Sequence, residues 1–250
     1  MARVIPVALL LLGLAALLPI SAEAQSANAV DLTGVWAPYR GGRGADPKLA
    51  APAAGPLVLK GEFAKRFEAR KAAEAEAADR GEPLAAGSVQ CIPYGMPRMM
   101  AVALYPVEIL QGPKQITMIA EAFSEVRRIY MNVPQLGIGD IPPGYYGRSV
   151  GRWESDTLVV DTVGIKESVP AYQNMPHSGQ MRITERFRLV APDFLHDQIT
   201  LDDPIALEKP VTYTLAYRRM PNYQMVEFVC DNNREYVDEK GQTHMRLRDK

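Results

Sequence analysis

The sequence contains few cysteines and histidines, and neither sign of charge is in excess. Two cysteines, Cys91 and Cys230, and three histidines occur in 250 residues. No CxxC pair and no Cys/His cluster is present, so the usual spacings of a structural zinc site are missing. Lysine and arginine total 28 against 29 acidic residues, without a long basic run. This balance argues against nucleic acid or an anionic membrane surface as the partner.

Several sequence signatures of catalysis are also missing. The chain has no G-x-S-x-G motif, which argues against a serine hydrolase of the nucleophile-elbow type. It has no H-E-x-x-H or multi-histidine spacing of the kind that zinc and iron sites show. The glycine-rich stretch RGGRG at 40–44 lacks the P-loop lysine and the strand-to-helix context. We therefore expect neither a metal nor a cofactor.

One long apolar run is present, and it lies at the N-terminus. Residues 1–24 combine a short basic start, the stretch VIPVALLLLGLAALLPI and an A-E-A motif at 22–24. This arrangement is typical of a cleaved signal peptide. A transmembrane anchor is the alternative, but Pro6, Pro19 and the small-residue cleavage motif favour export. We expect a periplasmic or secreted chain with no membrane span after cleavage.

Export places the two cysteines in an oxidising compartment. A disulfide between Cys91 and Cys230 is the natural prediction there, and free buried thiols are the alternative. Such a bond would close most of the remaining chain into one loop. It would therefore stabilise the fold by restricting the unfolded state.

From about residue 105 onward, apolar and polar residues alternate in short runs between turn signals, which is typical of β-strands. Most neighbouring runs are joined by two to five residues, a length that suits antiparallel hairpins. A sheet of about ten strands tends to curl or close. We expect an all-β, antiparallel closed barrel with strands at 32–37, 106–111, 115–121, 125–131, 148–154, 157–163, 181–190, 194–201, 210–219 and 224–231.

The part before residue 89 has a different amino-acid composition. It is rich in Ala, Gly and Pro, and its charged block contains Phe63 and Phe67 at a helical spacing. We expect an exposed helix at 61–80 with a thin apolar edge. Residues 25–88 would thus form an N-terminal strand and helical arm, and residues 89–250 would form the body of the same single domain.

Two motifs carry a resemblance to known proteins. The G-x-W pattern at 34–36, repeated at 151–153, resembles the signature on the first strand of lipocalins and related calycin barrels. The motifs SVGxWExDTLVVDT and HSxxMxxxERF are similar to those of a family of secreted bacterial proteins with a lipocalin-like barrel, over about residues 89–233. The resemblance implies that fold and a periplasmic or extracellular location, but no particular reaction. Arg148 and Gly179 stand where the family often has a histidine and an acidic residue.

Glu185 is the most informative polar residue. In the strand at 181–190 it shares a face with Met181, Ile183 and Phe187, whereas the opposite face is mostly arginine. A buried carboxylate must be paired or have a raised pKa. An ion pair with Arg127 or Arg128 is the structural explanation, and an acid–base role is the functional one.

His177 is the strongest single catalytic candidate, because it lies in a long loop that would deliver an imidazole over the barrel mouth. An ordinary exposed loop histidine is the alternative. Arg127 or Arg128 together with Tyr130 would hold an oxyanion or a phenol. We also expect substrate contacts from Glu121, Tyr146, Arg148, Trp153 and Tyr172.

The leading hypothesis is a cofactor-independent lyase, hydratase, dehydratase or isomerase that acts on a small apolar or aromatic molecule in the barrel, with His177 and Glu185 exchanging the proton. The alternative is a non-catalytic lipocalin-like binder or carrier of a hydrophobic small molecule. A third hypothesis is an interaction module that docks on a secreted partner. A homo-oligomer is left open.

Overall fold

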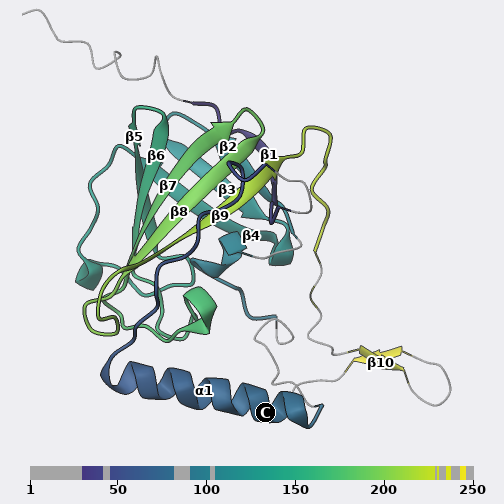
Figure 1. The fold of residues 1–250 in the computed structure, drawn as a ribbon. Coiled ribbons are helices and arrows are strands. Elements are labelled where there is room, and N and C mark those ends of the chain that lie inside the picture. The colour runs from purple at the N-terminus through teal and green to yellow at the C-terminus, as the bar shows by residue number, and fades with distance from the viewer. Residues whose placement is uncertain are drawn as a thin grey trace, which may run out of the picture.

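The computed structural model describes residues 30–41, 46–81, 91–101, 105–228, 230, 235–237 and 243–245. The expected signal peptide lies outside these residues. The centre of the molecule is a closed barrel of nine strands in chain order (Figure 1). The strands are β1 (Gly34–Pro38), β2 (Val107–Gln111), β3 (Gln115–Ala120), β4 (Glu125–Met131), β5 (Arg148–Glu154), β6 (Thr157–Val163), β7 (Arg182–Ala191), β8 (Phe194–Asp202) and β9 (Val211–Arg219).

The short first strand closes the barrel. β1 pairs antiparallel with β2 on one side and with β9 on the other, so the sheet has no free edge. The expected closed β-barrel is therefore confirmed. The strand expected at 224–231 is wrong, because residues 223–228 are irregular. The described chain also contains a small two-stranded sheet of β10 (Glu235–Val237) and β11 (Thr243–Met245).

One pair of barrel strands is parallel, which corrects the expectation of a purely antiparallel sheet. β4 and β5 run in the same direction, with Ile129 opposite Ser149 and Met131 opposite Gly151. A closed ring with an odd number of strands cannot alternate direction throughout, so one parallel pair is unavoidable. The long connection at 132–147 makes this pair feasible, because parallel neighbours need a crossover of a dozen or more residues.

Alternate side chains of each strand point into the barrel. Trp36 of β1 is buried, its indole N–H donates to the Leu32 carbonyl at 2.9 Å, and the Arg219 guanidinium lies 4.2 Å from the centroid of its ring. The other barrel residues of the core are mostly aliphatic, and burying such side chains drives folding. They include Ile109, Ile116, Met118, Ile129, Leu158, Ile183, Phe187, Leu195, Ile199 and Val211.

A single long helix, α1 (Gly61–Asp79), lies beyond one end of the barrel in the described chain (Figure 1). It confirms the helix expected at 61–80. Ion pairs spaced i, i+4 line its exposed surface, such as Arg70 with Glu74 at 2.6 Å. Arg70 also donates to the Asn174 carbonyl at 2.8 Å, which ties the helix to the loop between β6 and β7.

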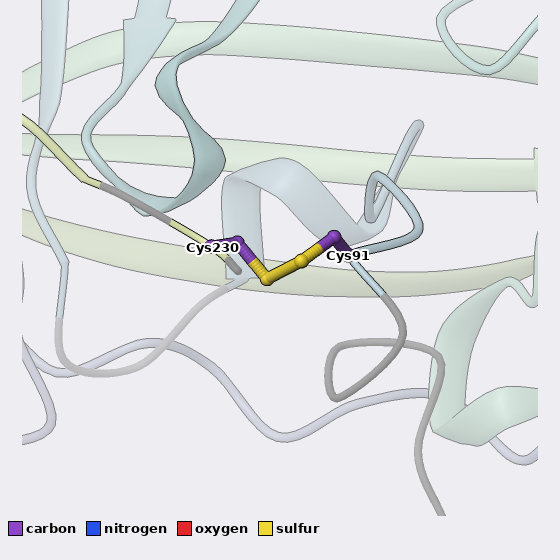
Figure 2. Close-up of a disulfide and its surroundings, with 2 residues drawn as sticks. All are labelled: Cys91 and Cys230. Carbon is purple, nitrogen blue, oxygen red and sulfur yellow. A yellow bond between two sulfur atoms is a disulfide. The ribbon is translucent and has the colours of Figure 1, made fainter. Parts of the chain in front are cut away.

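The loops contain short 3-10 helices and one disulfide. Cys91 and Cys230 are bonded, with their Cα atoms 5.7 Å apart, which confirms the expected pairing (Figure 2). None of the helices among the described residues is long and apolar enough to cross a membrane. The 3-10 helices are η3 (Arg98–Ala101), η4 (Ala122–Ser124), η5 (Ile138–Asp140) and η6 (Tyr172–Asn174).

Candidate functional site

A buried ion pair crosses the barrel interior. Arg127 of β4 and Glu185 of β7 both point inward, with side chains 1% and 0% exposed. One guanidinium nitrogen donates to Glu185 Oε1 at 2.8 Å, and the other contacts Oε2, so the pairing is bidentate. The ion pair that we considered as the structural explanation of Glu185 is thus present, and its partner is Arg127.

Two hydroxyl groups complete the surroundings of the guanidinium. Arg127 Nε donates to Ser149 Oγ at 3.0 Å, and Nη2 donates to Thr162 Oγ1 at 2.9 Å. The two hydroxyl oxygens lie 2.9 Å from each other. Each group comes from a different strand of the β4, β5, β6 series, where alternation places these side chains inside. The result is a closed polar network within an apolar core.

Asp197 of β8 is a second carboxyl group in the same interior. It lies diagonally across the β7–β8 ladder from Glu185, because Glu185 faces Ile199 and Phe187 faces Asp197. The side chain is fully buried, and neither carboxyl oxygen has a hydrogen-bond partner. Burial raises the pKa of Asp197 well above its usual range, the Glu185 charge adds to the increase, and Arg127 opposes it.

Tyrosines border this cluster. Tyr213 and Tyr217 of β9 are buried, and burial followed by the Asp197 charge raises the pKa of both phenols. Tyr172, one of the expected substrate contacts, stacks on Tyr213 with ring centroids 4.2 Å apart. Tyr172 is therefore the expected binding residue that lies next to the interior cluster.

His177 is held by the main chain. Its side chain is fully buried, with Nδ1 2.8 Å from the Ser178 carbonyl and Nε2 2.8 Å from the Val169 carbonyl. The Asp203 carboxylate accepts from the Ser178 amide and hydroxyl in the same turn. This is the environment of a loop-fixing residue rather than of an exposed loop histidine, and both ring nitrogens are already occupied.

Three expected site residues lie on the outer face of the barrel. Arg128 and Tyr130 alternate with the inward Arg127, and both are exposed. Arg148 lies over the Tyr130 ring at 5.4 Å from its centroid and donates to the Pro134 carbonyl at 3.2 Å. The structure thus selects Arg127 over Arg128 and separates Tyr130 from the interior, because adjacent residues of a strand point to opposite faces.

The remaining expected contacts lie at the ends of the barrel. Glu121 follows β3 and accepts from the Tyr223 hydroxyl at 2.8 Å and the Val226 amide at 3.0 Å, so it holds the segment after β9. Tyr146 hydrogen-bonds Glu125, and burial followed by this neighbour raises its pKa. Trp153 is half-buried and packs against the core.

Sequence reasoning missed Asp197, although the signal was present. Leu195, Asp197, Ile199 and Leu201 alternate along β8 as Ile183, Glu185 and Phe187 do along β7. The rule that singled out Glu185, a carboxylate on an apolar stripe, also applies to Asp197. The described residues contain no group of three or more His, Cys, Asp or Glu side chains arranged to hold a metal ion.

Comparisons with known proteins identify no family for this chain. No family model matches the chain, and no curated protein matches it. Two similar solved structures are a REP1-NXSQ fatty acid transporter and a point mutant of the same transporter, both 11% identical to the chain. They cover 77% and 76% of this chain and 98% of their own, with TM-scores of 0.35 and 0.34. A likeness this weak carries no argument about function.

Proposed function

We propose that the chain is a binding protein for a small, largely apolar molecule, with Asp197 as the polar anchor inside the barrel. The observation that carries the proposal is the fully buried carboxyl group without a hydrogen-bond partner. Leaving such a group unpaired destabilises a fold by about 1–3 kcal/mol, so buried polar groups almost always have partners. A ligand that donates a hydrogen bond supplies the missing partner.

The surroundings of Asp197 define the chemistry of this ligand. Neighbouring side chains on the inner face are Phe187, Leu195 and Ile199, which favour an apolar body. The charges of Arg127 and Glu185 cancel, and the two side chains are hydrogen-bonded to each other, so this pair does not require a charged ligand. A neutral molecule with a hydroxyl or an N–H group fits this environment, since it pairs with Asp197 and leaves the network intact.

A binder agrees better with the geometry than the enzyme that we considered first. General acid–base catalysis needs a group that is free to take or give a proton within reach of the substrate. Both oxygens of Glu185 are engaged by Arg127, and both ring nitrogens of His177 face main-chain carbonyls. A carrier needs neither group to be free. The catalytic roles of His177 and Glu185 stay predictions.

The test uses N-phenyl-1-naphthylamine, an apolar probe with one N–H donor whose fluorescence rises in apolar surroundings. We expect saturable binding to the wild-type protein and at least a tenfold loss of affinity, about 1.4 kcal/mol, in Asp197→Leu. The matched control is Asp202→Leu, a change at an exposed carboxylate of the same strand. Equal affinity of the Asp197→Leu variant and the wild type, or no binding to either, would refute the proposal.

We further propose that the chain is exported to the periplasm or the medium. The apolar run and A-E-A motif at 1–24 support this proposal, and a disulfide is typical of oxidising compartments. N-terminal sequencing of the protein recovered from a cell fraction tests it. We expect a chain that begins at Gln25 in the exported fraction, whereas an uncleaved chain in the cytoplasm would contradict export.

A further inference from the structure

A recess lies outside the barrel, where three segments meet. These are the stretch that follows Cys91, the loop between β4 and β5, and the loop between β6 and β7. The cavity has a volume of about 280 Å³, near the lower end of the range of roughly 300–1,000 Å³ for small-molecule sites. It therefore suits a small ligand. Its lining includes Pro93, Tyr94, Arg98, Tyr145, Ser168 and Pro170.

The walls of this recess are fixed by the backbone. Gly95 has a φ of +64°, and a Cβ added there would lie 2.5 Å from the Tyr145 carbonyl oxygen. Only glycine therefore allows the first two segments to approach this closely. The Met96 amide donates to the same carbonyl at 2.8 Å, and the Gly95 amide donates to Glu125 at 3.0 Å. The two tyrosines that line the recess are thus held on a rigid frame.

Arg98 carries a charge that no acidic group in the described chain pairs with directly. No hydrogen bond or ion pair among the described residues holds its guanidinium, which lies 5.3 Å from the centroid of the Tyr94 ring. Burial lowers the pKa of Arg98, the nearby Arg70 lowers it further, and Tyr94 and Glu125 oppose the decrease. Lys166 adds positive charge, with Nζ 4.5 Å from the centroid of the Tyr145 ring.

Neighbouring acids bind other groups and form no ion pair with Arg98 among the described residues. Glu74 is bound by Arg70, and Glu125 accepts from the Tyr94 and Gly95 amides and the Tyr146 hydroxyl. Glu167 is exposed and accepts from the Gly179 amide. The guanidinium donors of Arg98 are therefore free to pair with an anionic ligand that enters the recess.

We propose that this recess is a binding site for a small aromatic carboxylate, whose carboxylate pairs with Arg98 and whose ring packs against Tyr94 and Tyr145. Arg is the side chain best suited to hold a planar carboxylate through two parallel hydrogen bonds. Ser168 provides a further hydroxyl at the rim. Tyrosine rings stack favourably on aromatic groups, which adds specificity for the body of the ligand.

A carboxylate fits this site better than a phosphate. Phosphate sites usually offer several backbone N–H groups at a helix start or in a nest. Here the Val169 amide already donates to the Lys166 carbonyl, and the Tyr94 and Gly95 amides are taken by Glu125. One guanidinium and one hydroxyl remain, which match a monovalent carboxylate. The site is independent of the barrel interior, so it stands whether or not the interior binds a ligand.

The experiment is isothermal titration of the full chain with benzoate, benzyl alcohol and inorganic phosphate. We expect benzoate to bind at least about tenfold more tightly than either of the other two. Arg98→Gln should weaken benzoate binding by at least about tenfold, and Arg98→Lys should weaken it less, because the charge remains. The control is Arg128→Gln, which removes an exposed arginine on the outer face of β4.

Thermal denaturation of each variant shows that it is folded before it is titrated. Failure of benzoate to saturate the wild-type protein below about 10 mM would overturn the proposal. Equal affinity of the folded Arg98→Gln variant and the wild type would overturn it as well. So would phosphate that binds as tightly as benzoate, because the aromatic walls would then contribute nothing.

Discussion

Removal of Arg127 alone should destabilise the barrel more than removal of the complete ion pair. In Arg127→Met, the Glu185 carboxylate remains fully buried and loses both of its guanidinium hydrogen bonds. Breaking a buried pair in this way typically destabilises a protein by about 3–5 kcal/mol. For a chain of this size each kcal/mol lowers the melting temperature by about 2–4 °C, so we expect a decrease of about 6–20 °C.

The double variant Arg127→Met/Glu185→Leu removes both charges and replaces them with apolar side chains. Ser149 and Thr162 still hydrogen-bond each other, at 2.9 Å, so no hydroxyl is left without a partner. Buried pairs replaced in this way often leave stability unchanged or raise it by about 1–4 kcal/mol. We therefore expect the double variant to be more stable than Arg127→Met and close to the wild type.

Thermal and urea denaturation of the wild type, both single variants and the double variant give a complete double-mutant cycle. The control is the exposed pair of Arg186 and Glu154, 2.9 Å apart, where Arg186→Met should change stability by less than about 1 kcal/mol. The reasoning is refuted if Arg127→Met loses less than about 1 kcal/mol, or if the second substitution restores no stability.

Three further predictions concern Asp197, the disulfide and the segment that follows β9. Burial and the neighbouring Glu185 charge raise the pKa of Asp197 in the folded state. Its favourable contribution to the free energy of unfolding is therefore complete below about pH 4 and is lost as the pH rises through this raised pKa. Asp197→Leu should therefore gain unfolding free energy relative to the wild type as the pH increases from about 4 to 8, measured by urea denaturation. Reduction of the Cys91–Cys230 bond, which spans 139 residues, should lower stability by up to about 5 kcal/mol, measured as a decrease in melting temperature. Glu121→Ala should release the segment around 223–226 and accelerate proteolysis there, measured by mass spectrometry of the fragments, with little change in melting temperature.

Each of these predictions has a defined contrary outcome. A pH-independent difference between Asp197→Leu and the wild type would show that the carboxyl group ionises alike in both states. If a reductant shifts the melting temperature of the Cys91→Ala/Cys230→Ala variant as much as that of the wild type, the effect is not caused by reduction of the disulfide. Unchanged fragments from Glu121→Ala would show that other contacts hold the segment.

The sequence by itself determined the composition of each strand face and most of the strand positions. Alternation along 181–190 placed Glu185 with apolar residues and the arginines opposite, and the structure has this arrangement. Short connections predicted hairpins, and an oxidising compartment predicted the disulfide. These features depend on neighbours in sequence, where the two-residue period of a strand and the length of a turn act directly.

Only the tertiary structure decided which face of each strand lies inside and which strands are neighbours. Alternation separates Arg127 from Arg128 but does not indicate which one is buried; pairing of β4 with β3 and β5 does. The parallel β4–β5 pair follows from closure of nine strands, and the missing strand after β9 leaves a segment that Glu121 holds instead. The unpaired Asp197 and the Arg98 recess likewise depend on residues that are far apart in sequence. Only the closed barrel and its loops bring these residues together.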